Sequence, residues 1–247
     1  MSEGETTTDR LLAGEIVIVQ PQSGFRAGTD SVLLGVATAR LGRTQIALDA
    51  GCGAGGALFS AAYALPATRF CGLDSDAAIL PLADQGVHLN GLRDRVEVVK
   101  GDMAALPAEW ENQFDLVFSN PPYFPAGASS PPGAGKDAAY TERVPLDAWL
   151  KAMLFATRPR GTVLLIHRAA ELARILARLD RQAGEIVVMP VRPAPGLPAS
   201  RVIVRARKGL RPGPVTLLDG LVLHEAPGGR LTERAKDALE GKGLDWR

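Results

Sequence analysis

Residues 119–123, Ser-Asn-Pro-Pro-Tyr, combine two hydrogen-bond acceptors with an aromatic ring at the end of an apolar run. The run Phe114–Phe118 carries one charge and predicts a buried strand. Two prolines end this strand, because they donate no hydrogen bond to a sheet and restrict the residue before them. Such a turn can present the Asn120 amide oxygen and the Pro121 carbonyl to a planar amine, with the Tyr123 ring stacked on its face. The alternative is an ordinary turn after a strand.

A glycine-rich loop follows a second apolar run. Ile46–Ala50 predicts a buried strand, and the turn after it has glycine at Gly51, Gly53 and Gly55. These glycines let the backbone approach a ligand closely. Asp49, just before them, offers a carboxylate to an ammonium group or an ordered water.

Two more carboxylates follow the next two predicted strands. Asp74 can accept hydrogen bonds from both hydroxyls of a ribose, although a helix N-cap, which Asp76 fills equally well, is the alternative. Asp102 can accept from an adenine amine, with Met103 as an apolar neighbour; the alternative is a turn residue. Four such features in strand order favour a ligand site over four unrelated turns.

Alternating strands and helices must position these residues. The predicted strands are 46–50, 69–73, 96–100, 114–118, 161–167, 185–189 and 201–207, and the predicted helices are 29–41, 57–65, 76–90, 146–157 and 169–183. This alternation predicts an α/β fold with an open, mostly parallel, doubly wound sheet that binds ligands at the carboxyl ends of its strands. The polar–apolar alternation of 201–207 predicts an edge-like antiparallel strand.

The flanking segments carry their own signals. We expect a disordered tail at 1–9, a strand pair or edge strand at 11–19, a mobile lid or loop at 125–143, a hairpin around an Asp-Gly turn at 214–224 and a short helix at 231–239.

Length and composition favour one domain. The chain has 247 residues, of which 46% are hydrophobic, and this is enough for a single α/β core. We expect one domain over 1–247, with an N-terminal extension and capping helix (1–44), a core (45–208) and a C-terminal hairpin and helix (209–247). The first ten residues are polar and acidic and no run reaches transmembrane length, so neither a signal peptide nor a membrane span is expected.

The two cysteines, Cys52 and Cys71, lack the spacing of a metal site. They favour a reduced, cytoplasmic protein without zinc. Trp149 falls on the apolar face of its predicted helix and is expected in the core.

Charge is unevenly distributed, although the net charge is only +1. Residues 158–211 contain twelve Lys and Arg against three acidic residues, a net of +9, which leaves −8 for the remainder. A pole of this size can steer a polyanion; the alternative is solvated arginines on helix and strand faces.

The order of these motifs resembles the class I S-adenosylmethionine-dependent methyltransferases over residues 45–208. That resemblance implies a Rossmann-like sheet of seven strands with an antiparallel last strand. The segment 25–35, Phe-Arg-Ala-Gly-Thr-Asp-Ser-Val-Leu-Leu-Gly, together with 120–124 and the tail 217–239, is similar to the family that methylates N6 of the adenosine 3′ of the anticodon in tRNA1(Val). This second resemblance spans nearly the whole chain, although the loop 125–143 is longer and richer in Pro and Gly than is usual for the family.

The resemblance implies S-adenosylmethionine as cofactor and assigns roles to the motifs. The glycine-rich loop with Asp49 would hold the methionine part of the cofactor, Asp74 its ribose and Asp102 its adenine. The implied cofactor-binding residues are Phe25, Arg26, Asp49, Gly51, Gly53, Gly55, Asp74, Asp102 and Met103. Asn120 and Pro121 would accept the two N6 hydrogens of a flipped adenine, and Tyr123 would stack on it. No strong base is needed, so catalysis would be positioning and desolvation.

The same resemblance implies tRNA as the partner. We expect RNA to run over the basic C-terminal part, with Phe124, Arg205, Arg207 and Lys208 as candidate contacts, and binding to weaken with salt. Arg26 has three possible roles, in binding the cofactor carboxylate, in binding an RNA phosphate, or in a structural ion pair.

Three other functions remain open at this point. They are methylation of a protein glutamine amide, methylation of adenine in DNA, and cofactor binding without catalysis. Only about forty residues precede the core, which disfavours the first, since such enzymes carry an N-terminal helical domain. The intact Asn-Pro-Pro-Tyr disfavours the third.

Overall fold

The computed structural model describes residues 5–23, 26–122, 124–125, 141–142 and 144–246. Its strands are β1 (Thr6–Leu11), β2 (Ile16–Pro21), β3 (Ile46–Ala50), β4 (Arg69–Asp74), β5 (Val96–Lys100), β6 (Phe114–Ser119), β7 (Phe124–Pro125), β8 (Thr141–Glu142), β9 (Thr157–Arg168), β10 (Ala183–Arg192), β11 (Arg201–Lys208), β12 (Thr216–Leu217) and β13 (Leu221–Val222). Its α-helices are α1 (Thr29–Val36), α2 (Gly56–Ala64), α3 (Leu80–Leu89), α5 (Leu146–Ala156), α6 (Leu172–Leu179) and α7 (Glu233–Leu239).

The central sheet has the strand order β5-β4-β3-β6-β9-β11-β10-β12, and β13 also pairs with β10. Every pairing is parallel except those of β11 with β9 and β10. The predicted mostly parallel, doubly wound sheet is confirmed. Two details were wrong: the sheet has nine strands and not seven, and β11 lies inside the sheet, whereas the sequence indicated an edge-like strand.

The two extra strands come from the segment in which a hairpin was expected. β12 and β13 do not pair with each other; both add in parallel to β10. The backbone N–H of Leu218 donates to the carbonyl of Val188 at 2.9 Å, and that of Leu223 donates to Arg192 at 2.8 Å. The exposed edge of β10 therefore satisfies the donors that a hairpin would have paired internally.

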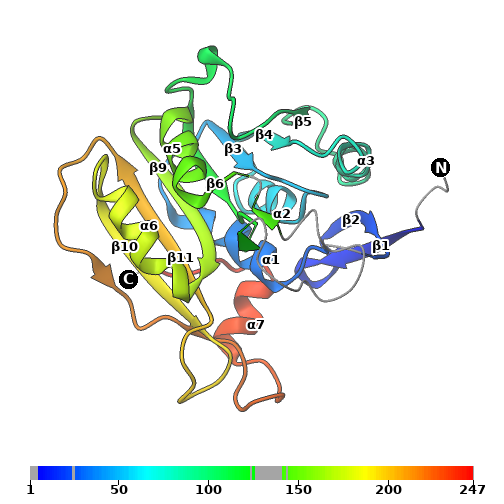
Figure 1. The fold of residues 1–247 in the computed structure, drawn as a ribbon. Coiled ribbons are helices and arrows are strands. Elements are labelled where there is room, and N and C mark those ends of the chain that lie inside the picture. The colour runs from blue at the N-terminus through cyan, green and yellow to red at the C-terminus, as the bar shows by residue number, and fades with distance from the viewer. Residues whose placement is uncertain (1–4, 24–25, 123, 126–140, 143, 247) are drawn as a thin grey trace.

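Helices cover both faces of the sheet (Figure 1). Side chains alternate between the faces, so Leu116 and Phe118 enter the core under α1, α2 and α7, while Val117 enters the core under α5 and α6. Because both faces are covered, all of β6 is buried, as its continuous apolar run predicts. In the described part of the chain, no helix has the length and apolarity that a membrane span requires.

The N-terminal hairpin corrects the prediction of a disordered tail. Residues 6–9 lie in β1, which pairs with β2 along six residues of each strand. The hairpin is held to α3 by Asn90, whose side chain accepts from the backbone N–H of Val17 at 2.8 Å and donates to the Val17 carbonyl at 2.7 Å. Figure 1 shows the hairpin next to α3, at the end of the sheet formed by β4 and β5.

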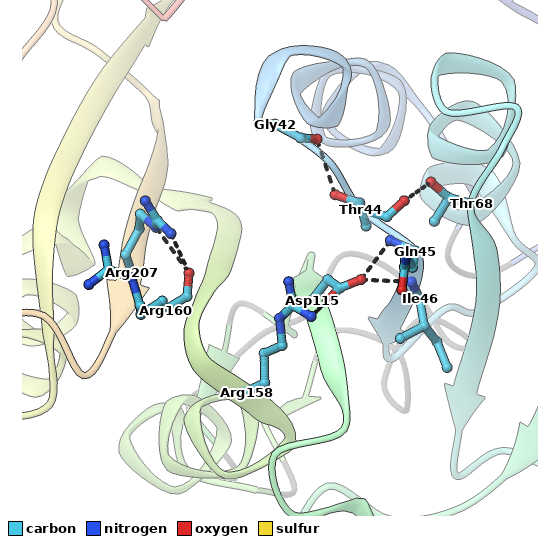
Figure 2. A network of polar contacts seen from close by, with 9 residues as sticks. All are labelled: Gly42, Thr44, Gln45, Ile46, Thr68, Asp115, Arg158, Arg160 and Arg207. Carbon is cyan, nitrogen blue, oxygen red and sulfur yellow. Dashed lines mark hydrogen bonds and ion pairs between the residues drawn. The ribbon is translucent and has the colours of Figure 1, made fainter.

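A buried carboxylate holds together the amino ends of β3 and β6 (Figure 2). Asp115 is 6% exposed, and its Oδ2 accepts hydrogen bonds from the backbone N–H groups of Gln45 at 2.6 Å and Ile46 at 3.0 Å. Its Oδ1 lies 2.5 Å from Nη1 of Arg158. This network fixes the edge of the sheet opposite to the carboxyl ends of the parallel strands.

We expect Asp115→Ala to lower the free energy of unfolding by about 3 kcal/mol, because the backbone N–H groups of Gln45 and Ile46 both lose their buried charged acceptor. Urea denaturation measures this loss. Arg158→Ala is the control: Arg158 is half exposed, and its removal should cost about 1 kcal/mol or less. Equal losses in the two variants would show that the ion pair, and not the backbone contacts, carries the stability.

Candidate active site

The carboxyl ends of β6, β3, β4 and β5 are neighbours, because these strands are adjacent and parallel. Asp49, Asp74, Asp102 and Asn120 each lie at or just after the end of one of these strands. The structure thus brings together the four features predicted from the sequence, at the edge where open α/β sheets bind ligands.

The glycine-rich loop is folded tightly against the end of β4. The backbone N–H groups of Gly51 and Cys52 both donate to the Leu73 carbonyl, at 2.8 and 2.9 Å. The N–H of Gly53 donates to Oδ2 of Asp74 at 2.8 Å. Gly51, Gly53 and Gly55 all have positive φ, at 77°, 53° and 96°, which explains why glycine stands at these positions.

Two acidic side chains face low-dielectric surroundings at this edge. Asp49 is 1% exposed, and its Oδ2 has no hydrogen-bond partner among the described residues. Burial, together with the negative charge of Asp74, raises the pKa of Asp49 well above its ordinary value. Burial also raises the pKa of Asp74, although hydrogen bonds from the backbone of Asp76 and Gly53 oppose this shift. A cation placed here would favour the charged forms of both groups.

Asp74 also holds the end of β5 in place. The N–H of Gly101 donates to the Asp74 carbonyl at 2.9 Å, which brings Asp102 to the neighbouring position. Asp102 is exposed and its Oδ1 accepts from the N–H of Ala104 at 2.8 Å, so it closes a turn, while Met103 is buried at 4% exposure. A carboxylate oxygen has two lone pairs, and both Asp74 and Asp102 retain acceptor capacity beyond these contacts.

The end of β6 is fixed from both sides. Ser119 is fully buried; its Oγ donates to the Ala50 carbonyl at 2.6 Å and accepts from the indole N–H of Trp149 at 3.0 Å. Asn120 is half buried and Pro121 is buried. Tyr123 lies outside the described residues, and for Phe124 the structure describes only a backbone position in β7.

Comparison with known proteins agrees with this arrangement. The family model for a methyltransferase domain matches residues 47–128. The chain is 30% identical over 195 residues to the tRNA1(Val) (adenine(37)-N6)-methyltransferases of Yersinia pestis and Yersinia pseudotuberculosis, and the match covers 77% of this chain and 77% of each relative. The chain belongs to the class I S-adenosylmethionine-dependent methyltransferases, in the family of these relatives. The family resemblance seen in the motifs is thereby confirmed.

Solved structures show the same fold. A protein from Agrobacterium tumefaciens, described as a predicted O-methyltransferase, has a TM-score of 0.71 and 24% identity, covering 88% of this chain and 99% of the other. A 16S rRNA methyltransferase of T. thermophilus has a TM-score of 0.58 and 20% identity, covering 83% of this chain and 50% of the other. At these identities the likeness concerns the fold alone.

The described residues of this methyltransferase fit its cofactor, S-adenosylmethionine. The methionine part of the cofactor carries an ammonium group, and the partnerless carboxylate oxygen of Asp49 needs such a donor. A Cβ added at Gly53 would meet nothing within 4 Å, so the loop leaves open space on that side. The described residues include no group of three or more His, Cys, Asp or Glu placed to hold a metal ion.

The segment before α1 lies on the glycine-rich side of the site. A Cβ added at Gly56, the first residue of α2, would be 2.4 Å from the Cβ of Ala27. Arg26 forms the ion pair that was one of its three expected roles: its Nη2 lies 2.7 Å from Oδ2 of Asp9, and its Nη1 donates to the Pro21 carbonyl. Phe25 lies outside the described residues.

The structure places two of the three predicted RNA-binding cations, Arg207 and Lys208, away from this edge. Arg207 and Lys208 end β11, which is antiparallel, so they lie at the amino edge of the parallel strands. Arg207 donates to the carbonyl of Arg160 (Figure 2), and Lys208 donates to Oδ1 of Asn112 at 2.7 Å. Arg205 lies 5.2 Å from the ring of Trp246, and burial lowers its pKa. An RNA contact at Arg207 or Lys208 would therefore lie at the edge opposite to Asn120, whereas Arg205 pairs with Leu164 of β9, which is level with Phe118 of β6.

Sequence reasoning missed the part that Trp149 plays at the site. Its amphipathic helix correctly predicted a core position, since Trp149 is 8% exposed. No sequence signal connects an α5 residue with the end of β6, because that contact depends on how the helix packs on the sheet.

We expect Gly51→Ala to destabilise the protein by about 2 kcal/mol, because a side chain is strained at its φ of 77° and the new Cβ would lie 3.0 Å from the Trp149 ring. Thermal or urea denaturation measures the loss. Gly91→Ala is the matched control, since Gly91 has a φ of 65° but open space around its Cβ position. If both variants lose the same stability, contact with the ring contributes nothing.

Proposed function

We propose that this methyltransferase modifies N6 of an adenosine in tRNA, the one 3′ of the anticodon in tRNA1(Val). The observation that carries the proposal is the family membership, since both relatives bear that activity in their names. The position of Asn120 supports it, because this acceptor follows a buried strand next to the glycine-rich loop. A tRNA substrate would place the enzyme in the cytoplasm.

The proposed mechanism gives each residue one task. Asn120 Oδ1 and the Pro121 carbonyl accept the two N6 hydrogens of the flipped adenine, and Tyr123 stacks on the ring. These contacts hold the amine in a fixed direction and reduce the overlap of its lone pair with the ring. No side chain has to remove a proton first, because the nitrogen becomes acidic once it has been alkylated.

The site geometry supports the proposed cofactor-binding roles. Asp49 and the backbone of Gly51, Gly53 and Gly55 would hold the methionine part, and Asp74 and Asp102 the ribose and adenine. S-adenosylmethionine supplies an electrophilic methyl group when bound. We further propose that the chain acts as a single domain, with its core at 45–208.

Methyl transfer to unmodified total tRNA tests the proposal. The enzyme is incubated with radiolabelled S-adenosylmethionine and tRNA, and the labelled nucleoside is identified after digestion. We expect N6-methyladenosine, with the label confined to one tRNA species. Label in another nucleoside, or transfer to a protein amide or to DNA but not to tRNA, would refute the proposal.

A further inference from the structure

A buried chain of hydrogen bonds links three elements around the site. The indole Nε1 of Trp149 on α5 donates to Oγ of Ser119, the last residue of β6, at 3.0 Å. That Oγ donates in turn to the carbonyl of Ala50, the last residue of β3, at 2.6 Å. Trp149 is 8% exposed, while Ser119 and Ala50 are fully buried, so water does not compete for these bonds.

The donors and acceptors in this chain of hydrogen bonds have a defined direction. A serine hydroxyl has one proton, and the Ser119 proton is used on the Ala50 carbonyl. The lone pairs of the same oxygen need a donor from elsewhere, and the indole N–H is the donor that the structure provides. A phenyl ring at position 149 would be smaller than the indole and would carry no N–H, so it could not satisfy this oxygen.

The Trp149 ring also touches the cofactor loop. A Cβ added at Gly51 would lie 3.0 and 3.1 Å from two carbon atoms of its six-membered ring, so the indole packs directly on the Gly51 backbone. Gly51 in turn donates to the Leu73 carbonyl of β4. One side chain thus contacts both the strand end that precedes Asn120 and the first glycine of the loop.

We propose that Trp149 is a positioning residue that sets the placement of the Asn120 turn relative to the glycine-rich loop. The inference rests on the proposed function where it concerns Asn120, but not where it concerns the loop. Trp149 does not touch the reacting atoms; it acts through Ser119 and Gly51. The same contacts would stabilise the fold even if they had no effect on the site, so the test must separate positioning from stability.

Trp149→Phe separates the two, with Trp246→Phe as the matched control. Trp246 is also 8% exposed, and its indole N–H donates to a buried backbone carbonyl, that of Ala37, at 2.9 Å. Both variants lose a buried indole hydrogen bond and should show similar falls in melting temperature. We expect only Trp149→Phe to bind S-adenosylmethionine about fivefold more weakly by calorimetry, the effect of one hydrogen bond, and to lower kcat about tenfold with little change in KM for tRNA.

Ser119→Ala is the second variant. It should reproduce both the weaker cofactor binding and the lower kcat, because it removes the hydroxyl at the centre of the hydrogen-bond chain with a minimal change in volume. The proposal is overturned if Trp149→Phe and Ser119→Ala bind the cofactor as tightly as Trp246→Phe does. Calorimetry needs no RNA, so this result is independent of the substrate. If the unchanged enzyme fails to methylate tRNA, the proposed function fails, while the comparison of affinities still decides the role of Trp149.

Discussion

Replacing Asn120 with alanine is expected to lower kcat for tRNA methylation about 1000-fold, the upper range for loss of one preorganised hydrogen-bonding group in an active site. The reason is positional: without the amide oxygen, one N6 hydrogen has no acceptor and the amine is free to rotate. Cofactor affinity should change by no more than about twofold, because the proposed role of Asn120 is a hydrogen bond to the substrate amine and not to the cofactor. Single-turnover methyl transfer and calorimetry measure the two quantities.

Asn120→Asp is the informative companion, because it keeps an oxygen acceptor at the same position while changing the charge. It should retain more activity than Asn120→Ala. The assigned role would be wrong if Asn120→Ala turned over at a near wild-type rate. It would also be wrong if the two variants were equally inactive while both bound the cofactor normally, since an oxygen acceptor at this position would then make no difference.

The second large effect is expected from Asp49→Asn, which keeps the shape of the side chain and removes its charge. We expect S-adenosylmethionine to bind about 50-fold more weakly, the range for loss of a hydrogen bond to a charged group. The cofactor-free protein should lose no stability, because Asp49 Oδ2 has no partner in the described structure and burial already disfavours its charge. Calorimetry and urea denaturation measure the two opposed results.

The stability of the cofactor-free protein should depend on pH in a definite direction. Burial raises the pKa of Asp49 above its value of 3.8 in the unfolded chain, so the folded protein binds more protons than the unfolded chain in the interval between the two values. Stability of the cofactor-free protein should therefore fall as pH rises from about 4 through that interval. Asp74 is shifted in the same direction, so Asp49→Asn should flatten this slope without abolishing it.

The affinity for S-adenosylmethionine should show the opposite dependence on pH. An ammonium group beside Asp49 favours the carboxylate, so binding of the cofactor releases a proton and tightens as pH rises. Asp84→Asn is the control, since Asp84 is an exposed carboxylate on α3 with an ion pair at 3.6 Å to Arg93. It should change neither the affinity nor the pH slope. If Asp49→Asn binds the cofactor with wild-type affinity, the buried carboxylate has no part in binding.

Much of this protein is determined locally by its sequence. A run such as Phe114–Phe118 can be buried on both faces only as an inner strand, and the two prolines after it must end that strand. The alternation of such strands with helices requires a parallel sheet, and in a parallel sheet the residues after each strand share one edge. Asp49, Asp74 and Asn120 could therefore be placed together before any contact was known.

The tertiary structure alone decided which partners these elements find. β12 and β13 have the sequence of a hairpin, but the unpaired edge of β10 offered their backbone groups better partners, and the number of strands changed accordingly. The contact of Trp149 with Ser119 depends on how α5 packs across the sheet. Neither outcome is encoded in local periodicity, because each one depends on a surface built from distant parts of the chain.

The basic segment, residues 158–211, also shows which features the sequence determines and which the tertiary structure decides. Arg207 and Lys208 are close in sequence to other cations, which indicated one RNA-binding surface. The antiparallel direction of β11, itself correctly predicted, carries these two residues to the amino edge, where they bind a backbone carbonyl and an amide oxygen of the protein. Sequence determines how many charges a segment has and which way its strand runs; the position of each charge relative to the site depends on the packed sheet, because neighbouring strands supply its contacts.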